Sequence, residues 1–332
     1  MPDRTCWFLL VKSEKKPEVF GLGEVAPLFG LSSESQEQVE VELNKLKVQI
    51  ESSTASLSSD PNTIEEAFGL LAYSSALRFG IVMALLDLYY NGQKKYFDSP
   101  FFHGQPLSIN GLVWMADAET MLKKAGEKIK QGFHCIKIKV GGLDFEEECR
   151  VLEAIRLEYS PQDLTLRLDA NGAFSVADAR KKLERLSIFQ IHSIEQPLSP
   201  SDQIRYPEIL RNAPIPIALD EQLIGRFSLP EKEALLATIR PSYLVLKPGL
   251  IGGFVETREW ISTAQNHGIG WWITSALETP LGLNAIAQFT SLFNPELPQG
   301  LGTGQIFEDL FEHPLSVEGG HLSLKKSQKW GF

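Results

Sequence analysis

The sequence predicts an α/β protein whose main part is a (β/α)8-type, TIM-like barrel, preceded by an N-terminal α+β capping domain. From about Ile109 onward, short apolar runs alternate with amphipathic helical patterns, and each pair has the length of one βα unit. Strands that alternate with helices form a parallel sheet. At least six consecutive units of this length favour a closed barrel over an open sheet. The predicted strands are CIKIKV, LTLRLDA, IHSIEQP, PIALDE, YLVLKP and GWWITSA.

The chain of 332 residues is longer than one typical domain and has room for the barrel and an addition. We place the capping domain at residues 1–100 and the barrel at residues 101–311, with residues 312–332 as a tail that packs back on the capping domain. Within the first part, WFLLV is a predicted strand and QEQVEVELNKLKVQI a predicted helix. The segment FGLGEVAPLFGLSSES is a predicted loop near the site. Ser75 to Tyr90 are apolar on most sides, which predicts a buried helix.

The helices between the barrel strands carry their own signals. The segment DFEEECRVLEAIRLEY places apolar residues from Phe145 to Tyr159 on one stripe. The segment SVADARKKLERL opens with Ser175 and has Asp178 three residues later, which resembles a capping box. The segment FVETREWISTAQNHG ends at Gly268, a residue type that commonly ends helices.

Composition excludes several classes of partner. The formal net charge is −10 and there is no dense Lys/Arg run, so nucleic acid is not expected. No apolar stretch reaches the roughly 18–20 residues of a membrane span, and the start of the chain resembles no signal peptide. Cys6, Cys135 and Cys149 lack metal-type spacing and are interpreted as reduced thiols. We therefore expect a cytoplasmic protein with a small-molecule partner, either a monomer or a homo-oligomer.

The stretch HCIKIKVGG places two lysines on one face of a strand. Side chains of a strand alternate between its faces, so Lys137 and Lys139 point the same way as Cys135. In a parallel barrel both strand faces are covered. The lysines are therefore expected to point into the barrel.

A polar residue stands near the carboxyl end of five predicted strands, 25 to 30 residues apart, which is one βα unit. Strand ends of a barrel meet at one face, where active sites form. Three carboxylates from successive strands are thus expected to converge between two lysines. The five residues are Lys139, Asp169, Glu195, Asp220 and Lys247.

Three neighbouring carboxylates repel one another unless a cation lies among them. All-oxygen ligands suit a hard divalent ion, Mg²⁺ or alternatively Mn²⁺. A buried lysine beside a dication and a second ammonium is expected to have a lowered pKa and to act as a base. This set favours proton abstraction next to a carboxylate, because a metal stabilises the resulting enediolate.

Six stretches of this chain together resemble the enolase superfamily, in the muconate-lactonizing-enzyme-like subgroup that uses a KxK motif and a later lysine. The resemblance runs from about Phe20 to Gly304. It implies a capping domain, a barrel, and Mg²⁺ held by Asp169, Glu195 and Asp220. The stretches are KIKVGG, LRLDANGAF, IEQPL, ALDE, LKPGLIGG and TSALETPLGLNAIAQF.

The resemblance also implies roles for the remaining residues. Lys139 is the expected acid/base that removes the α proton and then protonates the departing hydroxyl group. Lys247 is expected on the opposite face of the substrate, with Lys137 as electrostatic support. Residues expected to line the substrate are Asn171, Thr274 and Ser275. Arg167 and Glu221 are either supporting groups behind the site or simple strand-end packing, and Glu278 is expected to be structural.

The segment SALETPLGL and the compact length are similar to superfamily members that dehydrate 2-succinyl-6-hydroxy-2,4-cyclohexadiene-1-carboxylate in menaquinone biosynthesis. N-acylamino acid racemisation or dipeptide epimerisation is the alternative, because two lysines also permit proton transfer on both faces. Dipeptide epimerases of the superfamily carry Asp-x-Asp where this chain has GLGTGQ, which counts against them. A non-catalytic barrel that binds a partner is the third alternative. Family members have a further strand and loop before the segment that starts near Trp7, so the start is expected to be shortened.

Overall fold

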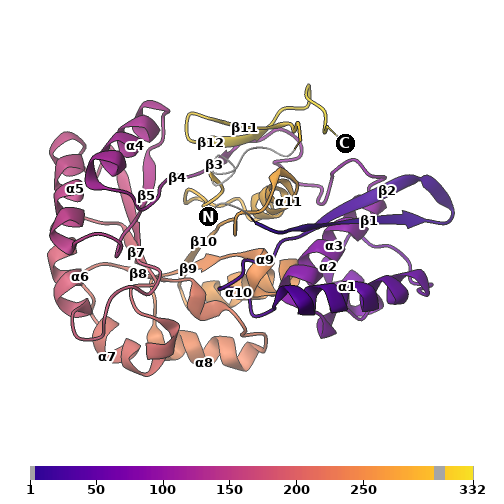
Figure 1. The fold of residues 1–332 in the computed structure, drawn as a ribbon, viewed down its shortest axis with the longest axis horizontal. Helices are drawn as coiled ribbons and strands as arrows, with labels where there is room; N and C mark the ends of the chain where they lie inside the picture. The colour runs from indigo at the N-terminus through magenta and orange to yellow at the C-terminus, as the bar shows by residue number, and fades with distance from the viewer. Residues whose placement is uncertain (1–3, 303–310, 332) are drawn as a thin grey trace.

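The computed structural model describes residues 4–302 and 311–331. Its N-terminal part pairs two antiparallel strands, β1 (Trp7–Ser13) and β2 (Lys16–Val25), with three helices. Figure 1 shows this part beside the main α/β body. The helices are α1 (Gln36–Glu51), α2 (Pro61–Ala67) and α3 (Ser75–Tyr89), with a 3₁₀ turn η1 (Leu70–Ala72) before α3.

Seven parallel strands form one curled sheet in the order β10-β9-β8-β7-β6-β5-β4. All six strands that the sequence predicted are present, although most are shorter than predicted. The first strand, β4, was not predicted. The strands are β4 (Gly111–Val113), β5 (Cys135–Lys139), β6 (Thr165–Asp169), β7 (Ser193–Glu195), β8 (Ile217–Leu219), β9 (Tyr243–Leu246) and β10 (Gly270–Ile273).

Helices follow most of these strands and cover the outside of the sheet (Figure 1). The helix predicted from Ser175 begins only at Ala179, because Ser175 and Asp178 hydrogen-bond each other in a turn before it. The helices are α4 (Ala118–Lys130), α5 (Phe145–Glu158), α6 (Ala179–Ser187), α7 (Tyr206–Leu210), α8 (Leu229–Ile239), α9 (Pro248–Ile251), α10 (Gly253–Asn266) and α11 (Pro280–Ser291). Two 3₁₀ turns, η2 (Pro200–Arg205) and η3 (Glu221–Leu223), flank β8.

Residues 299 and 300 bridge to both ends of the sheet. Gly300 pairs with Thr274, just after β10, and Gln299 pairs with Ile109, just before β4. The Gly300 amide donates to the Ile273 carbonyl at 2.8 Å, and the Asn110 amide donates to the Gln299 carbonyl at 2.9 Å. One short segment therefore connects the two edge strands.

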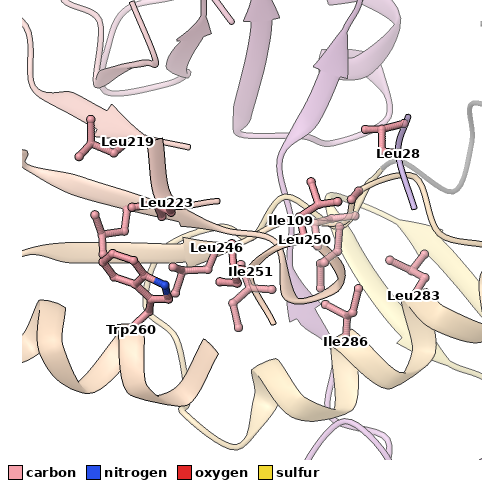
Figure 2. Close-up of a cluster of buried hydrophobic side chains, with 14 of the residues drawn as sticks. Leu28, Ile109, Leu219, Leu223, Leu246, Leu250, Ile251, Trp260, Leu283 and Ile286 are labelled. Carbon is pink, nitrogen blue, oxygen red and sulfur yellow. The ribbon is translucent and has the colours of Figure 1, made fainter. Parts of the chain in front are cut away.

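The core is continuous from the sheet to the N-terminal part. Figure 2 shows Leu246 of β9, Ile251 of α9 and Trp260 of α10 in a cluster of buried hydrophobic side chains. Helix α3 is buried over almost its whole length, as the sequence predicted. Arg78 of α3 forms buried ion pairs with Glu65 of α2 at 2.6 Å and with Glu256 of α10 at 3.6 Å, and the second pair joins α3 to a helix of the sheet.

The expectation of a loop for FGLGEVAPLFGLSSES is wrong in its first part, because Phe20 to Val25 belong to β2. The glycines there serve close packing. A Cβ atom at Gly21 would lie 2.0 Å from the carbonyl oxygen of Ala84, and one at Gly23 would lie 1.8 Å from that of Gly80. The glycines thus let the strand lie directly on the backbone of α3.

The end of the chain forms a second small sheet, with β11 (Leu315–Glu318), β12 (His321–Leu324) and β3 (Leu107–Ser108). Phe311 packs edge-on against Phe8 of β1, with ring centroids 6.2 Å apart. The tail therefore contacts both β1 and the entry to the main sheet. Within the described residues, no helix is long and apolar enough to cross a membrane.

We expect Gly23→Ala to destabilise the fold because its methyl group would overlap the α3 backbone. Overpacking of this kind costs about 1–3 kcal/mol or more of the free energy of unfolding. Gly126→Ala in α4 is the matched control, since a Cβ there meets open space. A helical Gly→Ala change stabilises by roughly 0.5–1 kcal/mol. Chemical denaturation of both variants checks this, and a Gly23→Ala protein as stable as the wild type would contradict the packing argument.

Candidate active site

Three carboxylates stand at the carboxyl ends of three adjacent strands. Asp169 ends β6, Glu195 ends β7, and Asp220 follows β8. The parallel register pairs Lys139 with Asp169 and Asp169 with Glu195, so these residues lie side by side across the sheet. All three carboxylates are buried, at 0 to 2% exposure. The convergence that the sequence predicted is therefore present in the fold.

The lysines of β5 point inward and contact these carboxylates. Lys137 Nζ donates to Asp169 Oδ2 at 2.9 Å and to the two Glu195 carboxylate oxygens at 3.1 and 3.0 Å. Lys139 Nζ lies 2.9 Å from Asp169 Oδ2. On the far side of the cluster, Lys247 Nζ donates to Asp220. The interior position predicted for the two lysines of KIKVGG is thus confirmed.

Lys139 has two further contacts at the mouth of the site. Its Nζ donates to Asn171 Oδ1 and lies 5.2 Å from the ring centroid of Trp114. The Asn171 amide nitrogen in turn donates to Glu221 Oε1 at 2.8 Å. A chain of hydrogen bonds therefore runs from the β5 lysine to the residue after Asp220.

Burial and mutual repulsion shift the pKa values of the three carboxylates. Burial, and then the charge of Asp169, raise the pKa of Glu195 to about 8. Burial and the neighbouring Glu221 raise the pKa of Asp220. Burial alone would also raise the pKa of Asp169, but Lys137, Lys139 and Lys247 together bring it below its ordinary value.

Two of the lysines have raised pKa values beside these carboxylates, whereas the lowered lysine pKa was expected for a lysine beside a dication and stays a prediction. Burial opposes the charge of Lys137, yet Asp169 and Glu195 overcome it and raise its pKa. Asp220 and Glu221 do the same for Lys247. These ammonium groups supply the counter-charge of the carboxylates.

The donor set fits a hard divalent cation. It consists of carboxylate oxygens that already surround a cationic Nζ atom, and hard cations bind such oxygens. No group of three His, Cys, Asp or Glu side chains within residues 4–302 and 311–331 forms a ready metal-holding cluster. In this structure the counter-charge of the carboxylates comes from lysine ammonium groups.

A pocket of about 600 Å³ opens above the cluster. The three lysines line it, together with Asn171, Glu221, Thr274 and Ser275. Leu28, Gly30 and Leu31 from the N-terminal part also line it, which confirms that the end of FGLGEVAPLFGLSSES lies near the site. The pocket is thus walled by both parts of the chain.

Arg167 lies inside the sheet but its contacts point away from the carboxylates. Its Nη1 donates to the Pro298 carbonyl at 2.8 Å, and its guanidinium lies 4.0 Å from the Trp272 ring centroid. Thr274 Oγ1 donates to the Gly300 carbonyl at 2.8 Å. The contacts with Pro298 and Trp272 hold Arg167 in the interior of the sheet. Burial there lowers its pKa and the charge of Glu195 opposes that shift, so its role as a supporting group behind the site stays a prediction.

Sequence reasoning missed two residues beside the site. Trp114 follows the short strand β4, whose sequence GLV begins with a glycine and gave no strand prediction. Gln196 directly follows Glu195 and is fully buried. Its position next to a proposed ligand in IEQPL was the available signal.

The fold and the site define an α/β protein whose parallel strand ends gather buried carboxylates between lysines. Residues 120–331 match the model of the family described as Enolase C-terminal domain-like. The chain belongs to this family and thus to the enolase superfamily, whose enzymes generally depend on a divalent metal.

Several relatives share much of the chain. It is 42% identical to the o-succinylbenzoate synthase of Desulfotalea psychrophila over 326 residues, which cover 92% of this chain and 88% of the relative. The crystal structure of MenC from D. psychrophila covers 97% of this chain and 94% of its own, with a TM-score of 0.88 and 39% identity. An N-succinylamino acid racemase of Amycolatopsis is 33% identical over 61% of this chain and 54% of the relative.

His192, directly before β7, has a lowered pKa in the folded protein. Its ring stacks on Tyr243 with centroids 5.0 Å apart, and its Nδ1 contacts Ser193 Oγ at 2.9 Å. Burial, and then the charge of Arg167, lower its pKa from 6.5 to about 4. The unfolded chain therefore binds a proton here at a higher pH than the folded protein does.

We expect His192 to lower the free energy of unfolding in mild acid. As the pH falls from 6.5 towards 4, the unfolded state binds the proton first, so the free energy of unfolding decreases. His192→Phe keeps an aromatic ring against Tyr243 and removes the titration, so its loss across this window should be smaller. Denaturation curves at several pH values measure it, and parallel losses in both proteins would refute the assignment.

Proposed function

We propose that this chain is a Mg²⁺-dependent dehydratase, a carbon–oxygen lyase that converts 2-succinyl-6-hydroxy-2,4-cyclohexadiene-1-carboxylate to o-succinylbenzoate in menaquinone biosynthesis. The observation that carries the proposal is the placement of Lys139 and Lys247 on either side of three buried carboxylates, beneath a pocket of about 600 Å³. The relative with 42% identity that is an o-succinylbenzoate synthase supports it.

For the fold we propose a (β/α)8-type barrel at residues 101–311 with a capping domain at residues 1–100. The bridges of Gln299 and Gly300 to both sheet edges support an eighth strand. The contribution of Leu28, Gly30 and Leu31 to the pocket wall supports the capping role.

Asp169, Glu195 and Asp220 would hold the Mg²⁺ ion, or Mn²⁺ in its place. Their oxygens are buried and lie at the ends of adjacent strands, as ligands for one hard cation would. When bound, the ion would stabilise the negative charge that develops on the substrate carboxylate.

Lys139 is the proposed acid/base. As a neutral amine, its Nζ takes the proton from the carbon next to the carboxylate. A ring double bond forms while the carbon–oxygen bond to the hydroxyl group breaks, and Nζ returns the proton to that oxygen, so water leaves. One group does both steps on one face, which makes the elimination syn. Asn171 and the ring of Trp114 hold Nζ at the pocket mouth.

Lys247 faces the substrate from the other side. Lys139 ends β5 and Lys247 follows β9, so three strands of the curled sheet separate them. The Lys247 ammonium would stabilise the enediolate electrostatically, and Lys137 would hold Asp169 and Glu195 in place. Substrate contacts are proposed for Asn171, Thr274 and Ser275, which line the pocket, with Glu221 behind Asn171.

We expect Lys139→Ala to abolish the dehydration, because the group proposed to take the proton is removed. General acid–base catalysis is typically worth about 10²–10⁴-fold, so kcat should fall by at least that factor. Loss of the diene absorbance with Mg²⁺ present measures the reaction. Lys123→Ala, at an exposed lysine of α4, is the control and should react as the wild type does.

Equal activity of Lys139→Ala and wild type would remove Lys139 from the mechanism. If the wild type itself leaves the diene unchanged with Mg²⁺ present, the dehydratase proposal fails. Removal of divalent ions with a chelator should also stop the wild-type reaction, and added Mg²⁺ should restore it.

Racemisation of N-succinylamino acids is the second candidate. It is favoured by the lysines on both sides of the site and by the racemase relative from Amycolatopsis. In deuterium oxide, each enantiomer should then gain deuterium at its α carbon, and Lys139→Ala and Lys247→Ala should each lose exchange with one enantiomer. No exchange with either enantiomer would dismiss this activity.

A further inference from the structure

Gln196 occupies a central place behind the carboxylate cluster. It follows Glu195 directly, its exposure is 0%, and its φ is +42°. A non-glycine residue in this left-handed region is uncommon and costs conformational energy. The position is therefore held by specific contacts.

Both the oxygen and the nitrogen of its side-chain amide form hydrogen bonds. Oε1 accepts the backbone N–H of Asp220 at 3.1 Å and that of Gln222 at 3.3 Å. Nε2 donates to the Leu198 carbonyl at 2.9 Å and to the Tyr206 hydroxyl. Two N–H donors on one side and two oxygen acceptors on the other fix which end is the oxygen.

Its backbone bonds reach the neighbouring strands on both sides. The Gln196 N–H donates to the Ala218 carbonyl of β8 at 2.9 Å, and its carbonyl accepts the Gly172 N–H, after β6, at 2.7 Å. One residue thus touches the segments that carry all three carboxylates.

The contact with Asp220 bears on ligand geometry. Asp220 has φ −126° and ψ −87°, outside the regular helix and strand regions, and it directly precedes the η3 turn. Gln196 Oε1 accepts the N–H groups of Asp220 and of Gln222, the second residue of that turn. Without that acceptor both buried donors would be unpaired, so the turn would have to shift and carry the Asp220 carboxylate with it.

We propose that Gln196 is a positioning residue that sets the distance and orientation of Asp220 relative to Glu195 and thereby the affinity of the site for its divalent ion. The inference rests on the proposed function, in which these two carboxylates are ligands. Groups that orient metal ligands typically contribute about 10–100-fold in metal affinity.

The test is Gln196→Met, which keeps the side-chain length and removes the four hydrogen bonds. Mn²⁺ binding to the full chain without substrate is followed by electron paramagnetic resonance, and Mg²⁺ binding by calorimetry. The dissociation constant should rise by about 10–100-fold.

Gln288 of α11 is a matched control. It is also 0% exposed, its Oε1 accepts the N–H groups of Tyr96 and Phe97 at 2.8 and 3.1 Å, and its Nε2 donates to Lys94 and Asn284. Gln288→Met should lower the melting temperature to a similar extent but leave the metal affinity at the wild-type value. A purely structural role of Gln196 would make the two variants alike.

Wild-type metal affinity in a folded Gln196→Met protein would overturn the inference, as would an equal loss of affinity in Gln288→Met. If Gln196→Met does not fold, Tyr206→Phe is the substitute variant for the metal-binding measurement. It removes one partner of Nε2 and should weaken metal binding by a smaller factor, whereas unchanged affinity would overturn the inference. If the wild type binds no divalent ion, the proposed function itself fails; if it binds one and the Gln196 variant binds equally well, only the positioning role fails.

Discussion

Buried carboxylates on adjacent parallel strands have to be neutralised, and the site is arranged around this requirement. Asp169, Glu195 and Asp220 are buried, and the parallel register leaves the first two side by side. Charges in such surroundings interact strongly and are expensive without partners. The Lys137 ammonium group donates hydrogen bonds to Asp169 and Glu195, and the Lys247 ammonium group donates one to Asp220. A divalent ion held by these carboxylates would add to the counter-charge that the lysines supply, so the electrostatics of the cluster and the proposed chemistry have one origin.

The N-terminal part completes the pocket because it is firmly attached to the sheet's helices. Glu24 of β2 accepts the N–H groups of Thr279 and Gly282, at 2.8 and 2.9 Å, at the beginning of α11. A carboxylate at a helix N-terminus is favourably placed for such bonds. This contact explains part of the SALETPLGL segment, in which Thr279 and Gly282 serve attachment of the N-terminal strand. Together with Arg78 it holds the residues after β2 over the pocket.

Much of the fold and site was predictable from the sequence because both obey a regular repeat. Alternating runs one βα unit apart predicted six strands and the convergence of the carboxylates, and Lys137 and Lys139 were correctly placed inside. Two strand segments were not predicted. Strand β4, with the sequence GLV, begins with a glycine, and Gln299 and Gly300 form only isolated bridges. The glycines of β2 were interpreted as signs of a loop. Their actual role, close packing on α3, involves residues far away in the sequence and cannot be read from the neighbouring residues alone. Gln196 was missed for the same reason, since its partners lie on other elements.

A crystal structure of the full chain with Mg²⁺ and o-succinylbenzoate would test the account most directly. The account predicts one ion bound by oxygens of Asp169, Glu195 and Asp220, with the product carboxylate against it. Lys139 Nζ should face one side of the product ring and Lys247 Nζ the other, while Lys137 stays against the carboxylates. An ion bound away from these three residues, or a product with both Lys139 and Lys247 on the same face, would contradict it.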